Sequence, residues 1–396
     1  MANDYRGAGP STRAVHAGEP PAETYGPVVN PIVLSSTFFS EPGGQGPVLY
    51  QRYGNAPNHL AVAERLAALE GGEDAVVLAS GMAAMACALL SVIQAGDHVV
   101  ATDAIYGGTR TLLAVELARL GIETTFVDLS SPGWVDAFRP NTKVVVGESP
   151  SNPLLRVLDL RPICDEAHRR GAVVIVDSTF ASPINCRPLE KGVDLVMHSA
   201  TKYLGGHTDL TAGVIVGARE RVAAVRERAK VWGPLLDAHA VWLLERGIKT
   251  LALRMERHNR NGMAVARWAE GRPGIARVHY PGLPSHPDHE TARRTLDGFG
   301  GMIGIELESG EAAARFVHAL RLAKVAPSLG GVETLVSEPR YTSHAGMTPE
   351  ARAANGIRDG FLRVSLGVED PEDIIADLEQ ALAAATEPVR ADAAAD

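Results

Sequence analysis

The chain has 396 residues, of which 45% are hydrophobic and 21% charged, and its formal net charge is −9. This composition is typical of globular proteins and excludes a disordered or fibrous chain, while the length predicts two or three domains with a sizeable core. The negative balance argues against nucleic acid or an anionic membrane as the main partner.

The first half of the chain shows the pattern of an α/β protein. The first 60 or so residues are rich in Gly, Pro, Ser and Thr and are predicted to form an extended arm, which needs a surface to lie against. Beyond them we expect strands at 75–79, 98–102, 124–127, 143–146, 172–177, 194–198 and 213–216, and helices at 60–69, 81–94, 107–120 and 159–170. Such alternation indicates right-handed crossovers and a mostly parallel sheet, and because the strands are nearly all apolar, helices should cover both faces.

The pattern changes near residue 250. We expect a long helix over 237–270, then a strand at 302–308, a helix at 311–320, a strand at 361–366 and a terminal helix at 371–385. The sequence therefore predicts an arm over residues 1–56, a large α/β domain over 57–250 and a smaller α+β domain over 251–396.

The cysteines and the N-terminus indicate the cellular compartment. Cys87, Cys164 and Cys186 have neither a paired spacing nor a zinc pattern, which suits a reducing environment. The first 18 residues lack the layout of a signal peptide, and no apolar run is long enough to span a bilayer. We therefore expect a cytoplasmic protein.

Polar clusters follow four of the predicted strands, where open α/β sheets bind their ligands. They are Ser80-Gly81-Met82, the segment 148–153 with Asn152, the segment 177–180 with Asp177, and the segment 199–207 with Lys202. Taken singly, each is ordinarily a helix cap, a turn or a solvated lysine. Together they offer phosphate-binding groups, an amide, a carboxylate and an amine, a combination that suits pyridoxal phosphate.

Further motifs identify a family. Tyr106-Gly107-Gly108-Thr109, Ser328-Leu329-Gly330-Gly331 and the segment 363–370 fall in order with the four clusters. The sequence resembles the Cys/Met-metabolism family of pyridoxal-phosphate enzymes, which includes cystathionine γ-synthase, cystathionine γ-lyase and methionine γ-lyase. The resemblance spans residues 11–385. It implies a fold-type-I architecture, in which a mostly parallel sheet lies between helices and a smaller α+β domain follows, and it implies pyridoxal 5'-phosphate as cofactor.

The resemblance also implies roles for individual residues. Lys202 would form a Schiff base with the cofactor and shuttle protons, and Tyr106 would stack on the cofactor ring and assist proton transfer at the leaving group. The implied cofactor-binding residues are Tyr50, Arg52, Ser80, Gly81, Met82, Tyr106, Asn152, Asp177, Ser199, Thr201 and Lys202. The implied residues for a small amino-acid substrate are Arg363, Ser328 and Asn152, and no metal is implied.

Two of these residues imply an oligomer. Tyr50 and Arg52 match a tyrosine and an arginine that reach the cofactor phosphate of a neighbouring subunit. The resemblance therefore implies a homodimer or homotetramer in which the arm crosses to a second copy of the chain.

Departures from the family pattern bear on the reaction at the substrate γ carbon. Gly108 stands where methionine γ-lyases commonly have Cys, and Pro327 stands where many cystathionine enzymes have Glu. With Tyr53-Gly54-Asn55, Pro327 favours γ-replacement of the cystathionine γ-synthase type. γ-Elimination by a cystathionine, methionine or homocysteine γ-lyase stays open. Thr342-Ser343-His344 also departs from the family pattern, at the predicted pocket wall.

Other functions have weaker support. Ser199 and Lys202 spell the S-x-x-K motif of serine acyl hydrolases, but the partner K-T-G and S-D-N motifs are absent. Residues 298–301 lack the glycine spacing of a nicotinamide site, and His286 and His289 have the wrong spacing for a metal pair. A cofactor-bound scaffold without activity is disfavoured because Lys202, Tyr106 and Arg363 are all present.

Overall fold

The N-terminal half of the chain is built around one sheet. The computed structural model describes residues 5–20, 23–343 and 345–386. Within them, seven strands are ordered β1-β7-β6-β5-β4-β2-β3. The strands are β1 (Asp74–Leu78), β2 (His98–Thr102), β3 (Glu123–Val127), β4 (Thr142–Glu148), β5 (Val173–Asp177), β6 (Leu195–His198) and β7 (Gly213–Gly217). Strands β6, β5, β4, β2 and β3 pair in parallel, and β7 runs antiparallel to both β1 and β6. The prediction of a mostly parallel sheet is confirmed.

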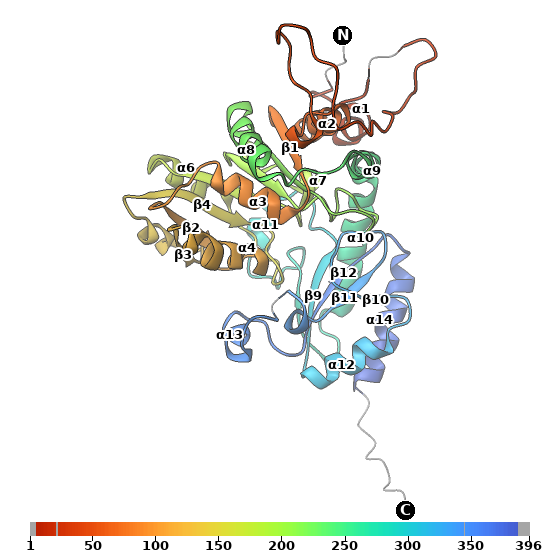
Figure 1. Cartoon of the computed structure of the whole chain (residues 1–396). Helices are drawn as coiled ribbons and strands as arrows, with labels where there is room; N and C mark the ends of the chain where they lie inside the picture. The colour runs from red at the N-terminus through yellow and green to blue at the C-terminus, as the bar shows by residue number, and fades with distance from the viewer. Residues whose placement is uncertain (1–4, 21–22, 344, 387–396) are drawn as a thin grey trace, which may run out of the picture.

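Helices cover both faces of this sheet (Figure 1). Ile175 of β5 shares a core cluster with Met85 of α3 (Gly81–Leu90), whereas its neighbours Val174 and Val176 share another with Ile163 of α6 (Leu160–Arg169). Because successive strand residues point to opposite faces, this alternation means that both faces are buried. Each such aliphatic side chain contributes about 2 kcal/mol on burial.

A second sheet follows, in the order β10-β11-β12-β9-β8. Its strands are β8 (Ile275–His279), β9 (Met302–Leu307), β10 (Lys324–Val325), β11 (Leu335–Ser337) and β12 (Phe361–Ser365). Its core combines Ile303 and Val364 from the sheet with Val265 of α10 (Leu251–Ala269), Phe316 of α12 (Gly310–Ala319) and Leu378 of α14 (Pro371–Thr386). This unit lies below the first in Figure 1, with α14 and α12 at its outer end.

The predicted single helix over 237–270 is wrong. The segment forms α9 (Ala238–Ile248) and α10, interrupted at Lys249 and Thr250. The guanidinium of Arg254 donates to the carbonyl of Gly247 at 2.7 Å and to the carbonyl of Tyr203 at 2.6 Å. The end of α9 is thus held against the loop that follows Lys202, and the chain starts a new helix from there.

Other elements differ from the prediction in extent. The predicted helix over 81–94 ends at Leu90, and the stretch 107–120 contains α4 (Gly107–Thr111), a π-helical segment (Leu112–Glu116) and α5 (Leu117–Arg119). Elements that the sequence pattern did not predict include α1 (Pro10–His16), α7 (Ser182–Asn185), α8 (Arg219–Trp232), α11 (His289–Thr295), α13 (Pro349–Ala354), β8, β10 and β11. None of the helices in the described residues is long and apolar enough to cross a membrane.

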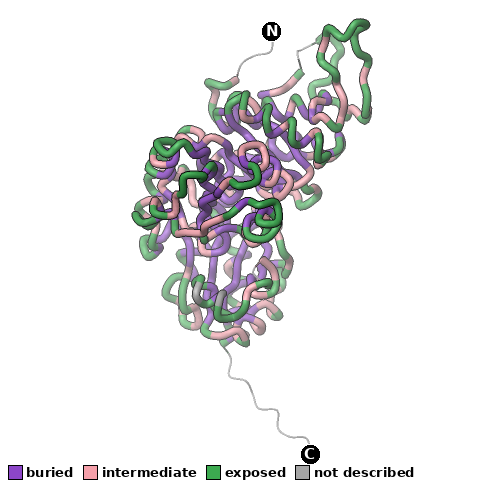
Figure 2. Tube along the Cα trace, turned by 60° about the vertical axis from the view of Figure 1, so that its left-hand side comes forward, coloured by how far each residue is buried: buried purple, intermediate pink, exposed green. Residues whose placement is uncertain are grey.

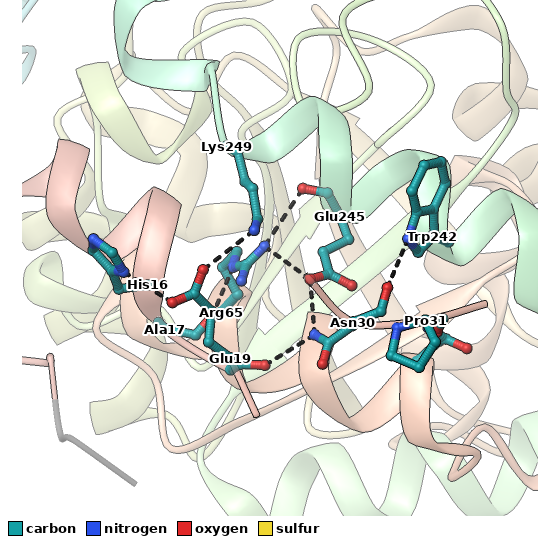
Figure 3. Close-up of polar contacts among 11 residues, drawn as sticks. His16, Ala17, Glu19, Asn30, Pro31, Arg65, Trp242, Glu245 and Lys249 are labelled. Carbon is teal, nitrogen blue, oxygen red and sulfur yellow. Dashed lines mark hydrogen bonds and ion pairs between the residues drawn. The ribbon is translucent and has the colours of Figure 1, made fainter. Parts of the chain in front are cut away.

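The N-terminal arm is fixed at its root by a polar cluster (Figure 3). The side-chain amide of Asn30 donates to the Glu245 carboxylate at 2.8 Å, and the indole N–H of Trp242 donates to the Asn30 carbonyl at 2.9 Å. Glu245 also pairs at 3.4 Å with Arg65, on α2 (Pro57–Glu70), and Arg65 donates to the Ala17 carbonyl at 2.7 Å. These contacts tie the arm to α2 and α9.

Outside this cluster, loops of the arm stand away from the rest of the chain (Figures 1 and 2). Figures 1 and 2 show its loops projecting from the molecule at the N-terminal end, largely exposed. Large apolar side chains of the arm face solvent, namely Tyr25, Val28, Leu34, Phe39 and Val48. Folded proteins rarely expose such a group of apolar side chains without a partner surface.

Candidate functional site

A cavity of about 630 Å³ lies between the first sheet unit and the second, and residues of both line it. Its floor is formed by residues at the carboxyl ends of β4, β5 and β6 and at the start of α3, and residues from the second sheet unit close it. Of the predicted site residues, it is lined by Ser80, Gly81, Met82, Tyr106, Asn152, Asp177, Ser199, Thr201, Lys202, Ser328 and Arg363. The structure therefore brings together residues that are up to 283 positions apart in the chain, Ser80 and Arg363 being the most distant.

Lys202 supplies an amine to the cavity. It follows β6, and its Nζ donates to the hydroxyl of Ser328 at 2.7 Å. Burial, and secondly the nearby Arg363 guanidinium, lowers the pKa of Lys202 to about 8. A lysine with this pKa exists partly as the free amine near neutral pH, the form that attacks an aldehyde.

Asp177 presents a carboxylate to the same cavity. It ends β5, and its Oδ1 accepts hydrogen bonds from the backbone N–H and the hydroxyl of Thr179, at 2.9 and 2.5 Å. Both of these bonds fix the same oxygen, so Oδ2 is available to a group in the cavity. Burial raises the pKa of Asp177, whereas the two Thr179 bonds and His198 act in the opposite direction.

The start of α3 forms an anion cradle. Ser80 caps the helix by accepting from the Ala83 N–H at 3.1 Å, so the simple interpretation of Ser80 as a cap is also correct. A Cβ on Gly81 would lie 2.9 Å from the Cβ of Ser199, so only glycine fits between the helix start and that strand end. The positive end of α3 and the Ser199 hydroxyl fit the phosphate of the predicted cofactor.

Arg363 approaches from the second sheet. It lies in β12, is buried, and donates to the Asn152 side-chain oxygen at 3.2 Å and to the Ser328 carbonyl at 3.0 Å. Burial lowers the pKa of Arg363 to about 10. Ser328 has φ of 87°, a left-handed backbone that is uncommon for a residue other than glycine. This strained residue contacts both Lys202 and Arg363, as strained residues at functional sites commonly do.

Sequence reasoning missed several residues of the cavity. Tyr341 lines it but was not predicted at all, and Glu148 and Thr179 line it but were predicted only as members of the segments 148–153 and 177–180, without a role of their own. Pro327, which the sequence connected with the choice of reaction, also lines it. Glu148 did carry a signal, because it is a carboxylate that ends an apolar strand in the same way as Asp177. His344, a predicted part of the pocket wall, lies outside the described residues, whereas Thr342 and Ser343 do line the cavity.

Tyr50 and Arg52 lie elsewhere in this chain. The Arg52 guanidinium donates to the carbonyl of Lys230 and lies near the rings of Tyr50 and Tyr53, at 5.6 and 5.2 Å from their centroids. Tyr50 and Arg52 line a separate surface hollow with Gly233, next to the end of α8. Within one chain, therefore, they do not contribute to the cavity that holds Lys202.

The family follows from comparison with known proteins. The model of the Cys/Met metabolism PLP-dependent enzyme family matches residues 11–383. This chain belongs to that family. It is therefore a pyridoxal-phosphate-dependent enzyme, and the predicted family, cofactor and fold-type-I architecture are confirmed.

Relatives of the enzyme include lyases and a synthase. L-methionine gamma-lyase of Porphyromonas gingivalis is 42% identical, over 96% of this chain and 98% of that protein. Cystathionine gamma-lyase of Bacillus subtilis is 42% identical, over 94% of this chain and 98% of that protein. A similar solved structure is that of cystathionine gamma synthase from Xanthomonas oryzae pv. oryzae, in complex with aminoacrylate and cysteine. It matches with a TM-score of 0.92 and 41% sequence identity, over 96% of this chain and 98% of that chain. These relatives support the family but leave the individual reaction open.

The residues that suggested a hydrolase or a metal site have different surroundings in the folded chain. The S-x-x-K residues Ser199 and Lys202 belong to the cavity of this cofactor-dependent family. His286 and His289 are within hydrogen-bond distance of the backbone carbonyls of Leu154 and Pro281, at 3.4 and 2.8 Å. In the part of the chain that the structure describes, no group of three or more His, Cys, Asp or Glu side chains is placed to hold a metal ion.

Proposed function

We propose that this enzyme exchanges a group at the γ carbon of a homoserine-derived amino acid for a thiol, as a cystathionine γ-synthase does. The observation that carries the proposal is the convergence of an amine, a carboxylate-binding guanidinium and a phenol on one cavity, from Lys202, Arg363 and Tyr106. When bound there, pyridoxal phosphate supplies an electron sink next to the substrate α carbon.

The residues of the chain then have distinct tasks. Arg363 binds the substrate carboxylate through a planar guanidinium whose position is fixed by Asn152 and Ser328. Lys202 takes the proton from the α carbon and moves protons at the β carbon, a task that suits an amine with a pKa of about 8. Tyr106, 40% exposed on the cavity wall, carries the phenol that protonates the departing group. Pro327 and Leu329 provide apolar walls that limit access of water.

The surroundings of the cavity can accommodate the thiol that γ-replacement requires. A second cavity of about 690 Å³ adjoins the first, and the two share Asn152 and Ser343. In γ-replacement a thiol enters after the leaving group has departed, and the adjoining cavity offers room for that thiol. Gly108 and Arg110 line this second space. γ-Elimination, which needs water instead of a thiol, is the alternative.

A substrate panel separates the two reactions. The purified holoenzyme is incubated with O-acylhomoserines, with and without cysteine, and separately with cystathionine, homocysteine and methionine, and the products are identified by mass spectrometry. Cystathionine formed from an O-acylhomoserine and cysteine supports the proposal. Formation of 2-oxobutanoate and ammonia from cystathionine or methionine, with no replacement product, would refute it and establish a γ-lyase.

We further propose that the active assembly is a homodimer or homotetramer in which Tyr50 and Arg52 complete the site of a second copy. Two features support this arrangement. The arm exposes apolar side chains such as Leu34 and Phe39, and Arg52 lies outside the cavity of its own chain. A neighbouring copy would cover the apolar side chains and bring a cation to a phosphate.

Mixing two defective variants tests this assembly. Arg52→Ala lacks the cation and Lys202→Ala lacks the amine, so each alone should be nearly inactive. If Arg52 acts across subunits, unfolding and refolding the two variants together creates sites in which both residues are intact, and activity returns. If Arg52 acts within its own chain, the mixture stays inactive. Arg228→Ala, which removes an exposed arginine of α8, is the matched control and should keep full activity.

A further inference from the structure

Glu148 is a buried carboxylate to which neither the family resemblance nor the proposed function gives a role. It is the last residue of β4, and only 4% of it is exposed. Across the sheet it pairs with Asp177 at the end of β5, so two carboxylates lie side by side beneath the cavity. Burying a second acid here is costly, which calls for a specific gain in return.

The two oxygens of Glu148 hold two separate loops. Oε2 accepts from the backbone N–H of Tyr106 at 2.7 Å, and Oε1 accepts from the backbone N–H of Asn152 at 2.8 Å. Tyr106 belongs to the loop after β2, whereas Asn152 belongs to the loop after β4, which contains cis peptide bonds before Pro150 and Pro153. One side chain thus links the backbones on two sides of the cavity.

Further hydrogen bonds connect Asn152 with the guanidinium of Arg363 and the amine of Lys202, the groups proposed to act on the substrate. The side-chain oxygen of Asn152 accepts from Arg363, Arg363 donates to the carbonyl of Ser328, and the hydroxyl of Ser328 accepts from Lys202. A change in the position of Asn152 therefore changes the position of the guanidinium. Because each of these contacts is direct, a continuous series of contacts connects Glu148 with Lys202.

We propose that Glu148 is a positioning residue, whose two carboxylate oxygens fix Tyr106 and Asn152 together and so set the geometry of the leaving-group phenol and the carboxylate-binding guanidinium. This inference rests on the proposed function for the tasks of Tyr106 and Arg363. Burial, and secondly Asp177, raises the pKa of Glu148, while the two backbone N–H groups act in the opposite direction.

Glu148→Gln tests this role because it removes only one of the two hydrogen-bond acceptors. In Glu148→Gln one oxygen becomes an NH₂ group, which cannot accept a hydrogen bond, so one of the two backbone N–H groups loses its acceptor. Asp377 provides the matched control, because it is a buried carboxylate of the second unit that accepts from the N–H groups of Arg321, Leu322 and Ala323 at 2.8 to 3.0 Å. Asp377→Asn makes the same chemical change away from the cavity.

The experiment combines amide hydrogen exchange with kinetics on the holoenzymes. For Glu148→Gln we expect faster exchange in peptides covering Tyr106 or Asn152 and an increase in KM for the amino-acid substrate of about 10-fold, the effect of leaving one buried N–H group without its acceptor. For Asp377→Asn we expect faster exchange at residues 321–323 and an unchanged KM. If Glu148→Gln fails to fold, Glu148→Asp, which keeps both oxygens but sets them back by one methylene, should show the same two effects.

Two results would overturn the inference. One is exchange at the Tyr106 and Asn152 peptides that does not differ from that of the wild type. The other is a KM effect that Asp377→Asn reproduces. The exchange measurement does not depend on which reaction the enzyme performs, so a failure of the proposed function and a failure of this role for Glu148 can be told apart.

Discussion

The lowered pKa of Lys202 predicts a pH-dependent change in stability when this lysine is replaced. The pKa falls from an ordinary value of 10.5 to about 8, first because the amine is buried and secondly because Arg363 is close. Between these two values the unfolded chain keeps the proton and the folded, cofactor-free chain releases it. The contribution of Lys202 to the free energy of unfolding therefore increases with pH across this window.

The magnitude follows from the two values. A difference of one pH unit in pKa corresponds to about 1.4 kcal/mol, so the difference between 10.5 and about 8 corresponds to about 3 kcal/mol. Below pH 8 the charged amine of Lys202 destabilises the folded chain by this amount. Lys202→Met has a side chain of similar length without the charge. We therefore expect the cofactor-free variant to be more stable than the cofactor-free wild type by up to about 3 kcal/mol at pH 7, with the difference disappearing above pH 10.5.

Urea unfolding measures this difference. Cofactor-free wild type and Lys202→Met are unfolded at pH values from 6.5 to 11, and the free energies of unfolding are subtracted at each pH. Lys143→Met, which removes an exposed lysine of β4, is the control and should show a difference that does not vary with pH. A stability difference for Lys202→Met that is the same at pH 7 and pH 11 would refute the reasoning.

Three further predictions concern other residues. The family resemblance implies that the Asp177 carboxylate is the partner of the cofactor's pyridine nitrogen. Asp177→Asn should therefore reduce kcat by about 100-fold or more, because a neutral amide cannot keep that nitrogen protonated; steady-state kinetics that match the wild type would contradict this role. Arg363→Lys should increase KM for the amino-acid substrate by about 10-fold, because a point charge replaces a fork that binds carboxylate with two hydrogen bonds, and an unchanged KM would exclude the assigned role. Glu245→Leu should lower the free energy of unfolding by about 3 kcal/mol, because it leaves the buried Arg65 unpaired and Asn30 without its acceptor; a loss below about 1 kcal/mol would show that this cluster does not anchor the arm.

The cavity could be predicted from sequence because its residues follow a local rule. Asp177 and Lys202 each come directly after an apolar strand, and in a parallel sheet such positions converge at one edge. Arg363 is different, because it lies within a strand of the second sheet. The family resemblance, not the rule, identified it.

What the sequence did not reveal depends on contacts between distant segments. Strands β10 and β11 have two and three residues, too few to show an alternating pattern. The break between α9 and α10 depends on Arg254, which binds the loop after Lys202 only in the folded chain. The sequence placed Glu148 in a polar cluster at a strand end, but its contact with the backbone of Tyr106 forms only in the folded chain. The limits of the domains, the cytoplasmic location and the roles of the single site residues stay predictions.

Chemical trapping of the cofactor tests the central claim most directly, namely that Lys202 is the residue that bonds pyridoxal phosphate in this cavity. The holoenzyme is reduced with borohydride and digested, and the modified peptide is identified by mass spectrometry. We predict that the pyridoxyl group is found on Lys202 and that Lys202→Ala carries none. A modified lysine outside the cavity, or wild-type turnover by Lys202→Ala, would contradict the account.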